Sequence, residues 1–192
     1  MSYLPDHFTA NDWTRIQGFI ELFPLATLIS HFENEIFTSH IPFIISENKL
    51  LGHINKENPQ FQHLHNSKVE LVFHGGDAYI SPAAFPTEEL PTFNFAKVHV
   101  KGSVSYGDDQ ELIQSLVEMT DQMDSDFKLA YTHPKIEMLK HFIQGFEVSI
   151  DSFHGRFKMS QDKSQAHFEK AKVLLKESQT QRLDYFLNSL QY

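Results

Sequence analysis

The chain has 192 residues, of which 41% are hydrophobic, and its 18 phenylalanines are enough for one ordinary buried core. Its formal charge of −9 disfavours a general nucleic-acid-binding surface, and the lack of cysteine excludes disulfides, thiolate metal sites and cysteine nucleophiles. No basic segment followed by an apolar run opens the sequence, and no apolar stretch approaches the roughly 20 residues that span a bilayer. We therefore expect a cytoplasmic protein without a membrane segment.

The first expected element is a helix. Thr9 and Asp12 have the spacing of a capping box, and Trp13, Ile16 and Ile20 recur at helical spacing. The sequence then alternates with a period of two over residues 25–31 and 36–45, on either side of the polar stretch "FENE". This pattern predicts a β-hairpin.

Further strands are expected over residues 49–54, 68–74, 78–81, 96–106 and 146–153. Gly75, Gly76 and Asp77 predict a tight turn, because glycine readily adopts the positive backbone angles that such turns require. The alternation also predicts which strand residues point inward: Val98, Val100, Val104, Phe146, Val148 and Ile150.

Helices are predicted over residues 110–123 and 135–143, and the last thirty residues indicate two amphipathic helical pieces. Many strands with short turns in a small chain favour a closed barrel over a sandwich. The expected class is mainly β (α+β). We expect one domain over residues 1–165, with residues 166–192 as its C-terminal helical extension.

Two catalytic or metal patterns are weak. His63 and His65 could chelate a metal from a loop, but on a helix they would point to different faces. Ser81, His99 and Asp77 could form a triad, but the "GxSxG" turn is absent. Glycine-rich dinucleotide and phosphate-binding loops are absent as well, so a Rossmann or P-loop site is not predicted.

Polar residues along the first three strands and the following turn form a more coherent set. Their hydroxyl, imidazole and amide groups can donate to phosphate oxygens or to a polar ring without many formal charges. The alternative, residue by residue, is that each is solvated or bonded locally. The set is Thr27, Ser30, His40, His53, Asn55 and Asn58.

The stretch "TFNFAKVHV" leaves two interpretations open. Phe93 and Phe95 share strand parity with Lys97 and His99, so one face would be aromatic at one end and polar at the other. A bulge near Ala96 would turn the aromatic rings into the core. Without it, the mixed face would stack on a planar ligand and bond its edge.

Seven motifs in order resemble the PaiB-like proteins, described as FMN-binding negative transcriptional regulators. They are "LATLISH", "SHIPF", "LLGHINKENPQ", "AYISPAAFP", "LPTFNFAKVHVKG", "GFEVSID" and "GRFKMSQ". The resemblance covers most of the chain, from "YLPDHF" to Ser164.

The resemblance implies the split β-barrel of the pyridoxamine-phosphate-oxidase-like flavoproteins, and a homodimer with FMN at the subunit interface. It implies that FMN meets one group of residues, of which the last four suit its phosphate: Thr27, Ser30, His40, the backbone of Ile41, His53, Asn55, Asn58 and Gln60. Across the dimer it implies a second group against the ring, with a lysine supplying positive charge: Tyr79, Ser81, Phe93, Asn94 and Lys158.

Phe93 and Phe95 depart from the family's Trp and Tyr at these positions, which keeps stacking but removes two hydrogen-bonding groups. Two function classes stay open: an FMN-dependent oxidoreductase, or a transcriptional regulator or interaction module that keeps the barrel without catalysis. The sequence shows no basic recognition helix, so direct DNA binding by the isolated chain is not expected.

Overall fold

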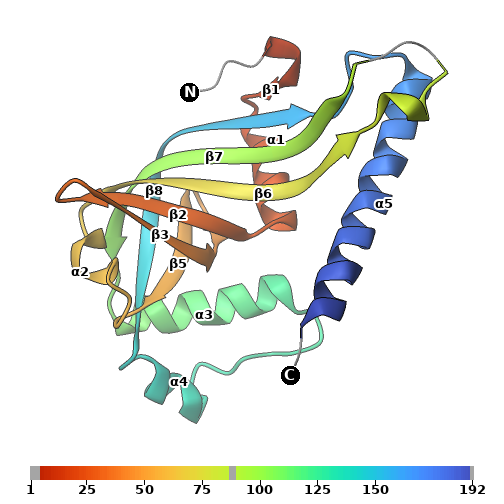
Figure 1. Cartoon of the computed structure of the whole chain (residues 1–192). Coiled ribbons are helices and arrows are strands. Elements are labelled where there is room, and N and C mark those ends of the chain that lie inside the picture. The colour runs from red at the N-terminus through yellow and green to blue at the C-terminus, as the bar shows by residue number, and fades with distance from the viewer. Residues whose placement is uncertain (1–4, 87–89, 191–192) are drawn as a thin grey trace. The chain divides into compact units, whose positions relative to one another are not determined.

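A computed structural model describes residues 5–86 and 90–190, and within these the chain forms one eight-stranded sheet with flanking helices (Figure 1). The strand order is β3-β2-β6-β7-β8-β5-β4, and β1 pairs with β8. The strands are β1 (Thr9–Ala10), β2 (Leu25–Phe32), β3 (Glu35–Pro42), β4 (Ile44–Ser46), β5 (Lys49–Asn55), β6 (Lys68–Ile80), β7 (Thr92–Tyr106) and β8 (Ile143–Lys158). The α-helices are α1 (Trp13–Leu22), α2 (Phe61–Leu64), α3 (Asp109–Met123), α4 (Pro134–Leu139) and α5 (Gln165–Ser189). Two 3₁₀ turns are η1 (Asp6–Phe8) and η2 (Pro82–Ala84).

The described residues fall into two compact units. The central unit contains residues 13–73 and 98–153, and the terminal unit contains residues 1–12, 74–97 and 154–192. Strands β6, β7 and β8 contribute to both units. Each unit is therefore built from segments that are far apart in the sequence.

The predicted hairpin is present as β2 and β3, which pair antiparallel from Leu25↔Pro42 to Phe32↔Glu35. Its turn residues, Glu33 and Asn34, have φ angles of 48° and 67°. Two successive positive φ angles are the conformation of a type I′ turn, whose twist matches that of the flanking strands. The local sequence therefore sets the register of this hairpin.

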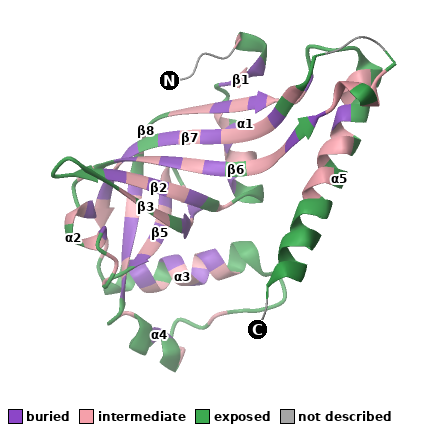
Figure 2. Cartoon of the chain, viewed as in Figure 1, coloured by how far each residue is buried: buried purple, intermediate pink, exposed green. Residues whose placement is uncertain are grey.

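The core of the central unit is built around Phe43, which is 1% exposed. Its ring centroid lies 6.1 Å from that of Phe73 and 5.7 Å from that of Phe146, both in edge-on contact. A Cβ at Gly52 would lie 2.8 Å from Phe43 Cε1, so the ring fits here because this strand position has no side chain. Buried and less buried residues alternate along β6, β7 and β8 (Figure 2).

The alternation predicted for β7 and β8 is largely confirmed. Val98, Val100, Val104, Phe146 and Val148 are each 3% exposed or less, whereas Ile150 is only half-buried. The helices α1 and α3 pack against β4, and α3 also packs against β5. The sheet and its helices fit the predicted mainly β class.

The predicted turn at Gly75–Asp77 is wrong, because β6 runs without interruption from Lys68 to Ile80. No glycine in the described chain has a positive φ angle. A Cβ at Gly76 would instead lie 3.3 Å from Leu175 Cδ2 on α5. Gly76 thus permits close packing between a strand and a helix of the terminal unit.

Both ends of the chain also differ from the helical prediction. Thr9 does not begin α1 but pairs with Arg156 in the β1–β8 ladder, and its Oγ1 donates to Asp6 O at 2.9 Å. Where two helical pieces were predicted, the described residues form one helix, α5, from Gln165 to Ser189. Its sequence contains no Gly or Pro that would end it, and Ser164 caps its first turn.

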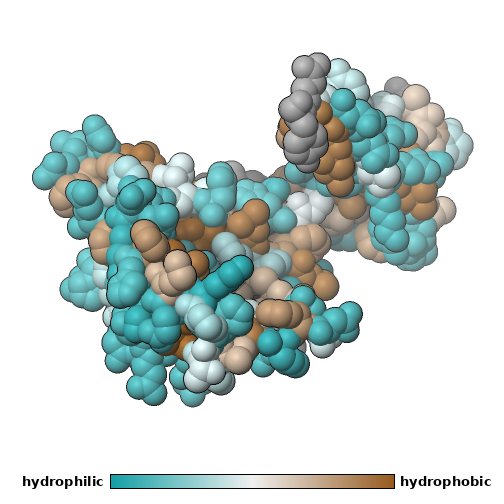
Figure 3. All heavy atoms as spheres, turned by 90° about the horizontal axis from the view of Figure 1, so that it is seen from below, coloured by the Kyte–Doolittle hydropathy of each residue, from teal (hydrophilic) through white to brown (hydrophobic). Residues whose placement is uncertain are grey.

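Among the described residues, no helix combines the length and the apolar character that crossing a membrane would require. On the face seen in Figure 3, hydrophobic side chains are interspersed with hydrophilic ones.

Candidate functional site

Two of the predicted cofactor-binding residues meet on the exposed face of the β2–β3 hairpin. Thr27 and His40 are paired across the two strands, and Thr27 Oγ1 lies 3.3 Å from His40 Nδ1. Alternation places Leu25 and Ile36 on the same face, where they are 55% and 73% exposed. A polar pair thus lies among apolar side chains that are open to solvent.

Ser30 and Gln60 have a different environment, since they are 2% and 1% exposed. Gln60 Nε2 donates to Ser30 Oγ at 2.8 Å, and Ser30 Oγ lies 3.1 Å from His63 Nε2. Ser30 Oγ therefore joins the Gln60 amide and the His63 ring in one hydrogen-bonded network. These groups join α2 to β2 inside the central unit, and Ile41 is buried nearby in β3 at 5% exposure.

The loop between β5 and α2 is held by its two predicted asparagines. Asn55 Oδ1 accepts the N–H of Glu57 at 2.8 Å, and Asn58 Oδ1 accepts the N–H of Gln60 at 2.9 Å. Both are local turns of the kind that asparagine favours. Asn58 Nδ2 also donates to Ser39 Oγ at 2.9 Å. Ser39 and His40 are neighbours in β3, so Asn58 meets this strand on the face opposite to the Thr27–His40 pair.

His53 lies on β5, on the strand face that it shares with Lys49 and Leu51. Its Nδ1 is buried and has no hydrogen-bond partner within the described structure. Burial lowers the pKa of His53 below the ordinary 6.5, because the imidazolium form would lose its hydration. This favours a neutral ring, so His53 is a poor source of positive charge for a phosphate.

The lowered pKa of His53 predicts a pH dependence of stability. Below pH 6.5 the unfolded chain binds a proton at this residue more readily than the folded chain, so the free energy of unfolding should fall as the pH falls. Urea unfolding at pH 7.5 and pH 5.5 should show a smaller difference for His53→Gln than for the wild type. The exposed His31→Gln variant should keep the wild-type difference, and an equal difference in all three proteins would contradict the expectation.

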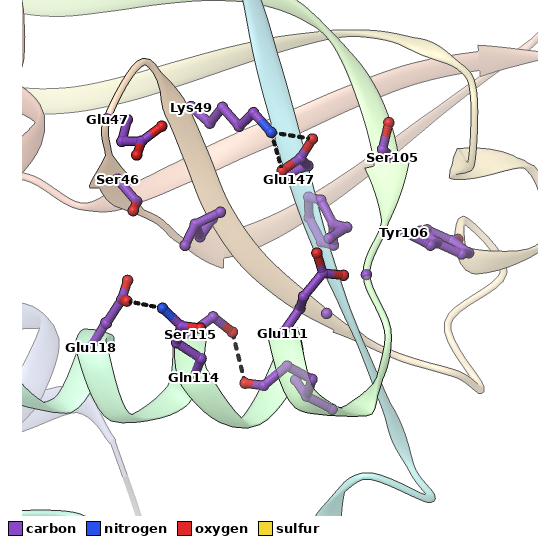
Figure 4. Close-up of a pocket in the computed structure, with 15 residues that line it drawn as sticks. Ser46, Glu47, Lys49, Ser105, Tyr106, Glu111, Gln114, Ser115, Glu118 and Glu147 are labelled. Atoms are coloured by element: carbon purple, nitrogen blue, oxygen red, sulfur yellow. Dashed lines mark hydrogen bonds and ion pairs between the residues drawn. The ribbon is translucent and has the colours of Figure 1, made fainter.

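A cavity of about 430 Å³ lies in the central unit between α3 and the strands β5, β7 and β8 (Figure 4). Lys49 Nζ donates to both carboxylate oxygens of Glu147, at 2.7 and 2.8 Å, and this hydrogen bond raises the pKa of Lys49. Glu111 accepts the N–H of Asp108 as part of a capping box. Four glutamates line the cavity against one lysine: Glu47, Glu111, Glu118 and Glu147. Such a lining repels a phosphate, and none of the predicted cofactor-binding residues belongs to it.

The terminal unit separates the predicted ring-binding residues into two groups. Tyr79 and Phe93 are 57% and 48% exposed near the ends of β6 and β7. Asn94 follows Phe93 in an extended strand, so it points to the opposite face, where it is 1% exposed. Ser81 is engaged locally, since its Oγ accepts the N–H of Ala83 and caps η2.

Asn94 and Lys158 line a second cavity, of about 370 Å³, within the terminal unit. Lys158 Nζ donates to Thr92 Oγ1 at 2.7 Å, and Asn94 Nδ2 donates to Ser160 Oγ at 2.9 Å. The sequence interpretation missed Lys163 and His167, which complete the polar part of this cavity. The sequence signal for these two residues is the run of basic residues that begins near the end of β8 and continues into α5.

The residues of the alternative catalytic and metal patterns make contacts with other side chains and with the backbone. His99 Nδ1 lies 2.9 Å from Glu70 Oε1, and His65 Nδ1 accepts the N–H of Tyr106 at 3.0 Å. Asp77 pairs with Arg182 at 2.9 Å and with Lys97 at 3.5 Å. Burial raises the pKa of Asp77, but these two cations outweigh it and leave the pKa lowered. Asp77 is thus a structural partner of α5.

The amino-acid sequence is similar to those of known proteins. Residues 2–152 match the sequence model of the family described as "Putative FMN-binding domain". The chain is 24% identical over 176 residues to protease synthase and sporulation protein PAI 2 of Bacillus subtilis, covering 86% of this chain and 85% of that protein. This match confirms the predicted PaiB-like resemblance.

Two solved structures share the fold. The FAD and heme binding protein from Mycobacterium smegmatis has a TM-score of 0.65 at 14% identity, covering 85% of this chain and 80% of that one. The flavocytochrome Anf3 from Azotobacter vinelandii has a TM-score of 0.63 at 16% identity, covering 81% of this chain and 72% of that one. The predicted split-barrel class is confirmed, and the family model supports the predicted cofactor, FMN. The chain belongs to the FMN-binding family whose model spans its residues 2–152.

Proposed function

We propose that this protein holds FMN on the exposed β2–β3 face at the interface of a homodimer, and that the bound flavin carries out redox chemistry. The observation that carries the proposal is the Thr27–His40 pair among the exposed side chains of Leu25 and Ile36. Exposed apolar residues favour burial against a second copy, and the polar pair supplies hydrogen bonds to a ligand trapped there.

The donor set fits a flavin phosphate in an acidic chain. A phosphate monoester carries about −1.5 to −2 charges at neutral pH, whereas the chain carries −9. Binding therefore depends on local donors and not on the overall field. The Thr27 hydroxyl and the His40 ring are hydrogen-bonding groups on this face of the hairpin, whereas Asn58 contacts Ser39 on the opposite face of β3.

A second copy would complete the site with aromatic side chains. Tyr79 and Phe93 are large, exposed and close to the ends of neighbouring strands. Rings of this type stack on a flavin, and such contacts add about 0.5–1.5 kcal/mol beyond the area that they bury. In the proposed dimer these two residues of the second copy border the isoalloxazine ring.

FMN, when bound, supplies one- and two-electron redox chemistry, and the protein supplies position and environment. The regulatory alternative keeps the same cofactor and dimer but has no turnover. The two are distinguished by mixing the FMN-loaded protein with NADH or NADPH in the absence of oxygen. Bleaching of the flavin absorption supports an oxidoreductase, and an unchanged spectrum with both reductants supports the regulatory alternative.

The dimer and its cofactor can be tested together. The purified protein should show a flavin absorption spectrum and, by light scattering at micromolar concentration, twice the monomer mass of 22.3 kDa. Ile36→Asp should give a monomer and lose FMN, because it places a charge in the proposed interface. Leu22→Asp is the matched control, since Leu22 is 75% exposed on α1, outside that face. A monomer that retains FMN, or a dimeric Ile36→Asp variant, would reject the proposal.

A further inference from the structure

The second cavity, in the terminal unit, has the features of a small-molecule site. Its volume of about 370 Å³ is at the small end of the range for ligand pockets. Apolar side chains form one part of its lining: Phe8, Ile80, Phe85, Leu90 and Pro91. Hydrogen-bonding groups form the other: Thr92, Asn94, Lys158, Ser160, Lys163 and His167. An apolar wall with a few convergent polar groups is typical of sites that bind amphiphilic organic molecules.

The polar groups are held in fixed positions. Lys158 is anchored by its bond to Thr92 Oγ1, and Ser160 Oγ lies within hydrogen-bonding distance of both side-chain ends of Asn94. Asn94 and Ser160 are 1% and 8% exposed, so two buried polar side chains line the cavity. The amide of Asn94 has a second N–H beyond the one given to Ser160, and Lys158 has two more ammonium protons. The site therefore offers preorganised donors.

The charge of the lining selects the ligand. Among the described residues that line the cavity, Lys158 and Lys163 are the cations and Asp162 is the carboxylate. Six of the chain's 16 Lys and Arg residues, but only two of its 25 Asp and Glu residues, lie between His154 and Lys176. This local excess contrasts with the net charge of −9 and favours a monoanion.

The aromatic groups favour a flat ligand. Phe85 and His167 lie with ring centroids 4.6 Å apart and nearly perpendicular, and Phe8 is buried at 6% exposure. Aromatic rings stack on, or meet edge to face, a further planar group that enters such a cavity. The resemblance implies a flavin contact for Asn94 and Lys158, whereas the structure also brings Lys163 and His167, which lie beyond the residues that the family model matches, to the same cavity.

We propose that this cavity binds a small aromatic carboxylate, with the carboxylate on Lys158 and Asn94 and the ring against Phe8 and Phe85. The site is separate from the proposed FMN site, because Asn94 points away from the face that carries Phe93. It assigns to Lys158 and Asn94 a ligand other than the flavin.

The test uses the full chain and 4-fluorobenzoate as a probe, observed by fluorine NMR. The dissociation constant should lie below about 1 mM, which matches an ordinary efficiency for a ligand of this size. The neutral 4-fluorobenzyl alcohol should bind about tenfold more weakly or worse, because it lacks the charge-assisted bonds. Equal binding of the alcohol would overturn the proposal, as would tenfold tighter binding of 4-fluorophenyl phosphate.

Variants locate the site. Lys158→Met should weaken 4-fluorobenzoate about tenfold or more, whereas Lys172→Met, which removes an exposed lysine of α5 outside the cavity, should leave it unchanged. If Lys158→Met does not fold, Lys163→Gln decides, with an expected loss of about threefold or more. Unchanged binding in a folded cavity variant would reject the proposal. Saturation with FMN should leave probe binding unchanged, and displacement by FMN would show that the cavity is part of the flavin site.

Discussion

FMN is expected to bind at least about a hundredfold more tightly than riboflavin, which lacks only the phosphate. Hydrogen bonds to a charged group contribute about 1.5–3 kcal/mol each, so two of them account for a factor of a hundred or more. The exposed Thr27–His40 pair is the proposed source of these bonds. Titration with each flavin, followed by quenching of its fluorescence, measures the ratio directly.

Two substitutions sharpen this test. His40→Ala should weaken FMN by about 1–3 kcal/mol and leave riboflavin nearly unchanged. His141→Ala is the matched control, since His141 is exposed after α4, outside the hairpin that carries the proposed site. Equal affinity for FMN and riboflavin, or an unchanged affinity for FMN in His40→Ala, would show that the phosphate does not bind to this face.

Asn58→Ala is expected to weaken FMN less than His40→Ala, because Asn58 contacts β3 on the face opposite to the Thr27–His40 pair and acts on that face only through the loop. Asn58 Nδ2 donates to Ser39 Oγ, so Ser39→Ala breaks that contact while it leaves the asparagine amide in place. A loss of FMN affinity in Asn58→Ala alone would indicate direct contact with the cofactor. The same loss in both variants would indicate that the loop acts through its position.

Phe43→Ala is expected to lower the free energy of unfolding by about 3–5 kcal/mol, the range for removing a buried aromatic ring. Phe43 is 1% exposed and lies in edge-on contact with Phe73 and Phe146. Gly52, which faces the ring, has no side chain that could fill the space. The free energy of unfolding of small domains is only about 5–15 kcal/mol, so this single substitution should remove a large part of it.

Urea unfolding followed by the fluorescence of Trp13, the single tryptophan, measures the loss. Leu22→Ala is the control: Leu22 is 75% exposed, so its truncation should change the free energy by less than about 0.5 kcal/mol. A loss below about 1 kcal/mol in Phe43→Ala would mean that the ring is less tightly packed than these contacts imply.

The sequence was most informative where structure depends on neighbouring residues. The β2–β3 hairpin follows from alternation and from two turn residues with positive φ angles, and the inward valines of β7 follow from period two. Gly76 was misread as a turn residue because its actual neighbour, Leu175, comes about a hundred residues later in the chain. No local pattern carries such information.

The same limit applies to the functional residues. Alternation alone could have separated Asn94 from Phe93, since adjacent residues of a strand point to opposite faces. The burial of Ser30 and Gln60 depends on how α2 packs against β2, which residue types do not reveal. Lys163 and His167 join Phe8 in one cavity only because the first and last segments of the chain meet in the terminal unit.

The pairing of β1 with β8 has a consequence for how the protein is made. Thr9 finds its partner only when Arg156 has been synthesised, and β5 likewise waits for residues 143–149 of β8. At roughly 5–20 residues per second, a ribosome needs on the order of 10–30 s to supply these partners. During that interval the emerging β5 has an unpaired edge, and such edges are prone to aggregate. Nascent chains of this protein should therefore depend on chaperones until β8 has left the ribosome.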